Sequence, residues 1–242
     1  MVYLKYTDFD DLYNNLSRLP LLQYEEYKEE LILSGSTYYM NNIIIEVSNC
    51  DCSIDMSKLN YTILKWNTLI NKYIDKSDYI EFKEKLNNHK SKTCTFNFKI
   101  HKDGKDACLV ALVLSRDKSN KPWTDIHIYY RITEIYKKFA VDLILLNKII
   151  NELPNCEIEN IHFHFPKFFF RIEFLTELIG GYFNLEEFNQ DNFATKHVKE
   201  LWNRYYTPGA NLSKYHSIAR KQKLKMRSEQ LTPLPIENLK IF

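Results

Sequence analysis

The sequence predicts an α/β (α+β) protein in which helices cover a β-sheet. Three segments rich in β-branched and aromatic residues are separated by short polar stretches, as strands joined by turns are: residues 93–100, 107–114 and 125–130. A helical pattern follows them, beginning at Thr133 or Glu134 and ending before Pro154. Because the helix follows these strands directly, we expect it to pack on the sheet that they form.

The neighbouring segments extend this pattern. Residues 8–33 have apolar positions at helical spacing, broken near Pro20, and predict one or two helices that end at Gly35. The other predicted elements are strands at 42–47 and 160–165 and helix from Leu59 to Leu86. The segment 107–114 (ACLVALVL) is apolar on both faces, so we expect it at the centre of the sheet.

The last third of the chain has a different composition. Residues 171–230 predict a helical insert that becomes increasingly basic, and residues 234–242 (LPIENLKIF) predict a final strand. No internal repeat or low-complexity linker is found, so we expect residues 1–242 to form one domain.

Composition excludes several classes of function. The 33 Lys and Arg residues nearly balance the 31 Asp and Glu residues, so no overall positive field would attract nucleic acid or membranes. Five glycines, none at the spacing of a phosphate-binding loop, argue against P-loop and dinucleotide-binding proteins. No apolar run approaches the roughly 20 residues of a membrane span, and no secretory leader is found, so we expect a cytoplasmic protein.

The five cysteines indicate thiol chemistry rather than disulfides or zinc. Their number is odd, and Cys50 and Cys52 are one residue apart without a CxxC partner. We therefore expect reduced thiols, one of which could be reactive, and no bound metal.

One carboxylate falls on the apolar side of the helix that follows Arg131. The predicted buried stripe consists of Ile135, Phe139, Asp142, Leu146 and Ile149. Burying an ionised carboxylate costs several kcal/mol unless it is paired, hydrogen-bonded or protonated. Asp142 is therefore either a functional residue or a local partner of Lys138, four residues earlier.

Two segments resemble the thymidylate synthase and deoxycytidylate hydroxymethylase superfamily. Residues 125–150 (DIHIYYRITEIYKKFAVDLILLNKII) are similar to its stretch in which a strand ends in Arg, an acidic residue follows three positions later, and a base-reading Asn or Asp lies in the next helix. Arg131, Glu134 and Asp142 occupy those positions. Upstream, residues 105–123 are similar to the family's nucleophile strand, which places Cys108 at the nucleophile.

The resemblance implies a thymidylate synthase-like mixed sheet covered by helices and a one-carbon transfer to C5 of a pyrimidine deoxynucleotide. Cys108 would add to C6 of the ring, Arg131 would hold the phosphate, and Glu134 would order water or substrate. The family's cytidylate hydroxymethylases have Asp at the base-reading position, so Asp142 implies a dCMP-type substrate. The alternative for Cys108 is a small core residue in a buried strand.

The resemblance also implies a cofactor and a second subunit. The one-carbon donor would be 5,10-methylenetetrahydrofolate, and the chain would form a homodimer. In the family, basic residues of the partner subunit bind the phosphate, and Lys90 and Lys92 lie in the corresponding region. The alternative for these lysines is a solvated surface position.

Two further groups are candidates for binding. His162 and His164 alternate on one side of a predicted strand, near the family's residues that hold the sugar hydroxyl. Two histidines could also hold a metal, but no third ligand is found at a suitable spacing. The basic segment from Arg220 to Arg227 is either a contact surface for nucleic acid or a partner, or a solvated helix face.

The chain also departs from the family pattern. Leu109 replaces His, Tyr130 replaces Gln, Ile132 replaces a phosphate-binding Ser, and no Arg follows Gly35. These departures favour a second interpretation, in which the chain is a catalytically inactive homologue that serves as a nucleotide-binding or interaction module.

Overall fold

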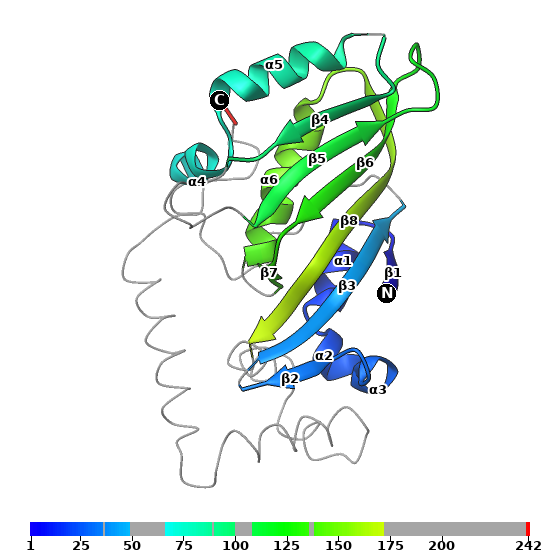
Figure 1. The fold of residues 1–242 in the computed structure, drawn as a ribbon, viewed down its shortest axis with the longest axis vertical. Coiled ribbons are helices and arrows are strands. Elements are labelled where there is room, and N and C mark those ends of the chain that lie inside the picture. The colour runs from blue at the N-terminus through cyan, green and yellow to red at the C-terminus, as the bar shows by residue number, and fades with distance from the viewer. Residues whose placement is uncertain (36, 49–65, 89, 100–107, 136–137, 172–240) are drawn as a thin grey trace, which may run out of the picture.

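The computed structural model describes residues 1–35, 37–48, 66–88, 90–99, 108–135, 138–171 and 241–242. These residues form a mixed α/β structure in which several helices accompany one eight-stranded sheet (Figure 1). The predicted class, a sheet covered by helices, is confirmed at this level.

The strands are β1 (Val2–Tyr6), β2 (Ile32–Ser34), β3 (Thr37–Val47), β4 (Thr93–Asn97), β5 (Leu109–Ser115), β6 (Trp123–Tyr130), β7 (Thr133–Glu134) and β8 (Cys156–Arg171). The helices are α1 (Phe9–Leu16), α2 (Leu19–Leu22), α3 (Tyr24–Tyr27), α4 (Trp66–Tyr73), α5 (Lys76–Leu86) and α6 (Lys138–Glu152).

The sheet is mixed in direction. Its strand order is β1-β3-β8-β6-β5-β4, with β2 paired to β3 and β7 paired to β8. β1 and β3 are parallel, as are β6 and β8 and also β7 and β8, whereas the remaining pairs are antiparallel. A parallel pair needs a crossover, and α6 provides it between β6 and β8.

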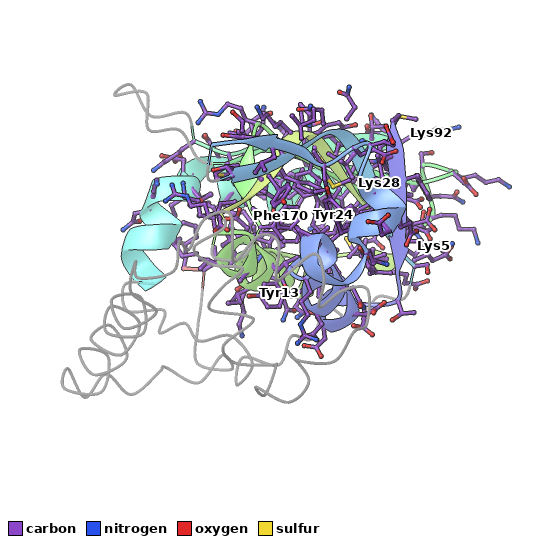
Figure 2. The ribbon with its side chains drawn as sticks, turned by 90° about the horizontal axis from the view of Figure 1, so that it is seen from below. Lys5, Tyr13, Tyr24, Lys28, Lys92 and Phe170 are labelled. Carbon is purple, nitrogen blue, oxygen red and sulfur yellow. The ribbon has the colours of Figure 1, made fainter. Side chains whose placement is uncertain are left out.

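The apolar core lies between one face of the sheet and the helices α1 and α6 (Figures 1 and 2). Phe139 of α6 packs against Phe163 and Phe165 of β8, with ring centroids 5.7 and 5.6 Å apart. Phe9 of α1 contacts the same Phe163 at 5.8 Å. The alternate residues of each strand point to the opposite face, which we call the polar face. It includes Tyr3, Lys5, Glu46, Asp125, His127, Tyr129, Asn160, His162 and His164.

The helix after Arg131 begins later than the sequence predicts. Thr133 and Glu134 form β7, which pairs with Phe168 and Phe169 of β8, so α6 begins only at Lys138. Sheet pairing overrides helix propensity at this point. The predicted buried stripe from Ile135 to Ile149 is nevertheless confirmed, since all five of its residues are buried.

Two other expectations about elements are wrong. The segment expected as a central strand forms β5, which is second from the edge of the sheet. Its alternate residues Ala111 and Val113 are only half-buried because they lie on the polar face. The N-terminal helices end at Tyr27 rather than at Gly35, because Ile32–Ser34 pairs with β3 as the strand β2.

Local irregularities interrupt the regular pairing of the sheet. In β3, Asn42 has φ of 56° and is passed over in the pairing with β8, although the register is the same on either side of it. In β5, the register with β6 shifts between Leu109 and Ala111. A register shift of this kind redirects side chains and strand ends, and it is common beside functional sites.

Several predictions fall outside the described residues. The helical insert at 171–230 lies there apart from Arg171, as does the basic segment 220–227. Only Ile241 and Phe242 of the expected last strand are described, and neither is in a strand. No helix in the described part of the chain is long and apolar enough to span a membrane.

Candidate functional site

Cys108 and Arg131 lie side by side although 22 residues separate them in the sequence. Cys108 immediately precedes β5, and Arg131 immediately follows β6. Because β5 and β6 are antiparallel, the beginning of one strand adjoins the end of the other. The backbone N–H of Arg131 donates a hydrogen bond to the carbonyl oxygen of Cys108 at 2.9 Å. The prediction that Arg131 lies at the end of a strand is confirmed.

Asp142 approaches the same place from α6. Its side chain is 1% exposed, and the burial raises its pKa to about 8. The Tyr73 phenol and the positive charges of Lys138 and Lys72 oppose this rise but do not cancel it. At neutral pH most Asp142 side chains are therefore neutral carboxylic acids, which can both donate and accept a hydrogen bond.

Buried polar atoms without a hydrogen-bond partner are concentrated around Asp142. Within the described residues there are five such side-chain atoms, and four of them are Tyr130 Oη, Thr133 Oγ1 and the two carboxyl oxygens of Asp142. Buried polar groups in native proteins are nearly always hydrogen-bonded, so these atoms are candidates to bind a polar ligand. With Tyr73 and Cys108, these residues form what we call the Cys108 cluster.

Tyr73 is a member of the cluster that sequence reasoning missed. It ends α4, is 6% exposed, and its carbonyl oxygen accepts a hydrogen bond from the N–H of Lys99 at 2.8 Å. Burial raises the pKa of its phenol, and the nearby charges of Asp142 and Cys108 raise it further. The phenol interacts with Asp142, although no hydrogen bond of ordinary geometry reaches either carboxyl oxygen.

The thiol of Cys108 is protonated in the free protein at neutral pH. Its burial raises its pKa, and so does the proximity of Asp142. Lys138, the Thr133 hydroxyl and Arg131 act in the opposite direction. Lys138 lowers the pKa of Cys108 more than Arg131 does, so Arg131 is not the main cation that favours the thiolate. A neutral Asp142 does not repel a thiolate, so the two ionisations are linked.

Glu134 has a structural contact at the start of α6. It is 2% exposed, and its Oε2 accepts a hydrogen bond from the N–H of Lys138 at 3.4 Å. The first N–H groups of a helix have no partner within the helix, so this carboxylate caps α6. Glu134 thereby helps to place Asp142, one helical turn beyond Lys138.

Lys90 and Lys92 lie far from Cys108 within one chain. Both are exposed in the connection between α5 and β4. Thr93 pairs with Ser115, at the end of β5 opposite to Cys108. The length of β5 places these lysines roughly 20 Å from Cys108 of the same chain.

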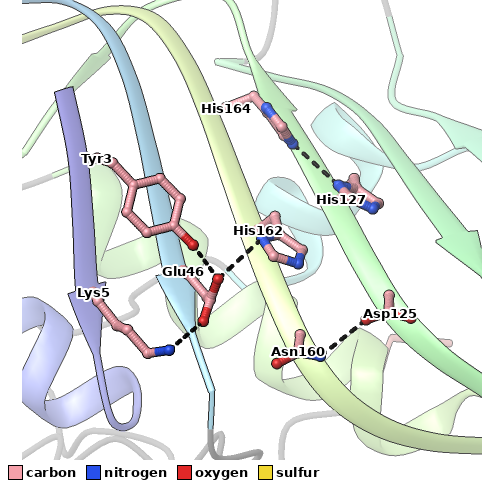
Figure 3. A network of polar contacts seen from close by, with 8 residues as sticks. All are labelled: Tyr3, Lys5, Glu46, Asp125, His127, Asn160, His162 and His164. Atoms are coloured by element: carbon pink, nitrogen blue, oxygen red, sulfur yellow. Dashed lines mark hydrogen bonds and ion pairs between the residues drawn. The ribbon is translucent and has the colours of Figure 1, made fainter. Parts of the chain in front are cut away.

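The structure does not bring His162 and His164 to the Cys108 cluster. They alternate along β8 with Phe163 and Phe165, which pack against α6, so the histidines point to the polar face (Figure 3). The sheet therefore separates them from Asp142. The alternation was visible in the sequence, because the face with aromatic and aliphatic residues is the one that a helix covers.

Polar contacts join these histidines to residues of three other strands. His164 Nε2 lies 3.2 Å from Nδ1 of His127 in β6. His162 Nδ1 lies 4.0 Å from Glu46 Oε2 in β3, and Glu46 forms an ion pair with Lys5 of β1 at 2.7 Å. Among the described residues, no group of three or more His, Cys, Asp and Glu side chains could hold a metal ion.

The geometry thus provides a thiol, a neutral acid, two phenols and nearby cations at the junction of β5, β6 and α6. Such a set can offer a nucleophile and hydrogen-bond partners to a polar ligand. No protein-family model matches the chain, and no curated protein matches it.

Proposed function

We propose that this protein is a pyrimidine deoxynucleotide C5 one-carbon transferase of the thymidylate synthase and deoxycytidylate hydroxymethylase kind. Cys108 is its nucleophile and a dCMP-type nucleotide is its substrate. The observation that carries the proposal is the presence of Cys108 and the unpaired Asp142 carboxyl in one buried polar cluster, with Arg131 hydrogen-bonded to Cys108.

The chemical step that this cluster would perform begins at C6 of the ring. The Cys108 thiolate forms a carbon–sulfur bond at C6, and the electron pair of the C5–C6 double bond moves to C5. C5 then bonds to a one-carbon electrophile and loses its proton. The thiolate leaves as the double bond forms again.

Asp142 would read the base. In its neutral form the carboxyl can donate its O–H to N3 of cytosine, and its carbonyl oxygen can accept a hydrogen bond from the exocyclic amino group. The raised pKa of Asp142 supports this role, because an ionised carboxylate could not donate. The exposed Arg131, directly beside Cys108, would bind the phosphate of the nucleotide.

The described residues give no support to a folate site. Where the related family has a Gly-Leu-Pro-Phe turn that touches folate, this chain has Lys137-Lys138-Phe139-Ala140. Phe139 and Ala140 are fully buried in the core, so they offer no surface to a pterin ring. Our proposal therefore assigns no step to methylenetetrahydrofolate and names the donor only as a one-carbon electrophile.

We include in the proposal a homodimer in which Lys90 and Lys92 serve the site of the partner subunit. Both are exposed and lie too far from Cys108 to reach a phosphate at the site of their own chain. Only a second copy of the chain would bring them to a nucleotide.

A second candidate function is nucleotide binding without turnover. The raised pKa of Cys108 favours it, because Lys138 and Arg131 do not offset the effect of burial and a buried, protonated thiol is a weak nucleophile. The two candidates agree on nucleotide binding and differ in whether Cys108 reacts.

Thermal unfolding in the presence of dCMP, dUMP, dTMP or dATP tests the binding that both candidates require. A ligand at about 100 times its Kd adds about 2.7 kcal/mol of stability. For a chain of this size, that raises the Tm by roughly 5–10 °C. We expect this rise with dCMP, and a loss of most of it in Arg131→Gln but not in Lys118→Gln, which removes another exposed cation. Indifference to all four nucleotides would refute the proposal.

A further inference from the structure

The polar face carries a cluster of three imidazoles outside the Cys108 cluster. The rings of His127 and His162 are stacked, with centroids 4.8 Å apart and planes 14° apart. Tyr129 stacks in the same way on His164, at 4.5 Å and 10°. Figure 3 shows His127 on β6 and His162 and His164 on the neighbouring strand β8. The three histidines are half-buried, so water reaches them only in part.

One of the two rings, His127 or His164, can be protonated without breaking their contact, but not both. The 3.2 Å between His127 Nδ1 and His164 Nε2 suits a hydrogen bond in which one nitrogen donates and the other accepts. If both rings were protonated, both nitrogens would be donors and both rings cationic. The rings would then repel each other with no acceptor between them.

The carboxylates near the histidines are already engaged by other partners, and the effect of Asp125, which raises the pKa of His127, is smaller than that of burial, which lowers it. Glu46 faces His162 but already binds Lys5 and the Tyr3 hydroxyl. Asp125 accepts hydrogen bonds from Asn160 and Thr124, at 3.1 and 2.7 Å. On the other side, the β5 residues that pair with β6 on this face are not titratable: Ala111, Val113 and Ser115.

We propose that His127 and His164 form a proton-sensitive latch between β6 and β8, closed while at least one of the two rings is neutral and opened when both are protonated. Burial and the neighbouring imidazoles lower the pKa of both residues, which agrees with a pair that resists protonation. The latch is a regulatory device of the fold, and it does not depend on the proposed nucleotide chemistry.

The sign of the pH effect follows from proton linkage. A histidine whose pKa is lower in the folded state than in the unfolded state adds stability that is present above the unfolded pKa. This stability is lost as the pH falls through the folded pKa. Acid should therefore loosen the contact between β6 and β8, starting below about pH 6.5.

The test compares the Tm of the wild type and of His127→Gln/His164→Gln at about pH 7.5 and about pH 5.5. Glutamine keeps hydrogen-bonding capacity but cannot take a proton. We expect the wild type to lose at least about 3 °C more than the double variant on acidification. His162→Gln, which keeps the latch pair, should retain most of the wild-type loss. Equal losses in the wild type and the double variant would overturn the proposal.

An NMR titration of the wild type decides the question if the double variant does not fold. We expect one imidazole of the latch pair to stay neutral well below the ordinary pKa of histidine, and the amides of β6 and β8 to exchange faster once it is protonated. Simultaneous protonation of both rings near the ordinary pKa, with no change in amide protection, would contradict the latch.

Discussion

A carboxyl group that is 1% exposed and has no hydrogen-bond partner is costly for a folded protein. Leucine at position 142 would fit the apolar stripe of α6 and avoid this cost. Sites that bind ligands often keep such unfavourable residues because the ligand supplies the missing contacts. Asp142 fits that description, and so do its unpaired neighbours Tyr130 and Thr133.

The residue-scale prediction concerns the pH dependence that Asp142 imposes on stability. Its pKa of about 8 in the folded protein lies above that of an unfolded Asp, so the unfolded state releases its proton first as the pH rises. The contribution of Asp142 to the free energy of unfolding is largest below the unfolded pKa, and it falls by about 1.4 kcal/mol per pH unit from about pH 4 to pH 8. Asp142→Asn should remove this dependence on pH and should be more stable than the wild type near pH 8.

Urea unfolding at several pH values within that range measures the effect. Asp125→Asn is a suitable control, because Asp125 lies on the polar face and is hydrogen-bonded to Asn160. The Asp125→Asn variant should keep the wild-type dependence of the free energy of unfolding on pH. If Asp142→Asn also keeps that dependence, Asp142 is not a buried neutral acid.

Residue patterns predicted part of the site. Helical periodicity placed Asp142 in the buried stripe, and the strand–turn–strand pattern brought Arg131 back to Cys108. Tyr73 could not be predicted, because it lies 35 residues before Cys108 and meets it only through the packing of α4.

His127 could have been placed beside His162 and His164, since Ile126 and Ile128 on either side of it point to the core.

At the scale of elements, the break between β6 and β7 decides where the cluster lies. β6 ends at Tyr130, and the short β7 continues the pairing with β8. Arg131 lies in this break, where its N–H bonds to the carbonyl oxygen of Cys108, and α6 begins after β7. The break has no clear signature in the sequence, which explains why the start of α6 was predicted four or five residues too early.

The element-scale prediction tests the backbone of β3 at Asn42. Asn42 has φ of 56°, a left-handed conformation that asparagine and glycine tolerate better than other residues. Asn42→Ala should therefore lower the free energy of unfolding by about 1 kcal/mol, whereas Asn42→Gly should be close to neutral. The neighbouring exposed Asn41, replaced by alanine, is the control. Equal stability of Asn42→Ala and Asn41→Ala would mean that the positive φ at position 42 imposes no strain.

At the scale of the whole molecule, the sheet separates two groups of titratable residues. The Cys108 cluster lies on the face that α6 covers, and the histidines lie on the polar face. The mixed α/β class was predictable, because alternating and helical patterns are strong over long segments. The position of β5 in the strand order was not predictable, because an apolar pattern on both faces does not distinguish a central strand from one beside the edge.

The central claim is that the sulfur of Cys108 adds to C6 of a pyrimidine nucleotide, and proton NMR of dCMP in D2O tests it most directly. Addition makes C5 basic, so C5 takes up deuterium, and elimination then returns dCMP labelled at C5; no one-carbon donor is needed. We predict that the C5–H signal disappears with the wild type and persists with Cys108→Ser. Binding of dCMP without exchange, or exchange that survives in Cys108→Ser, would contradict the account.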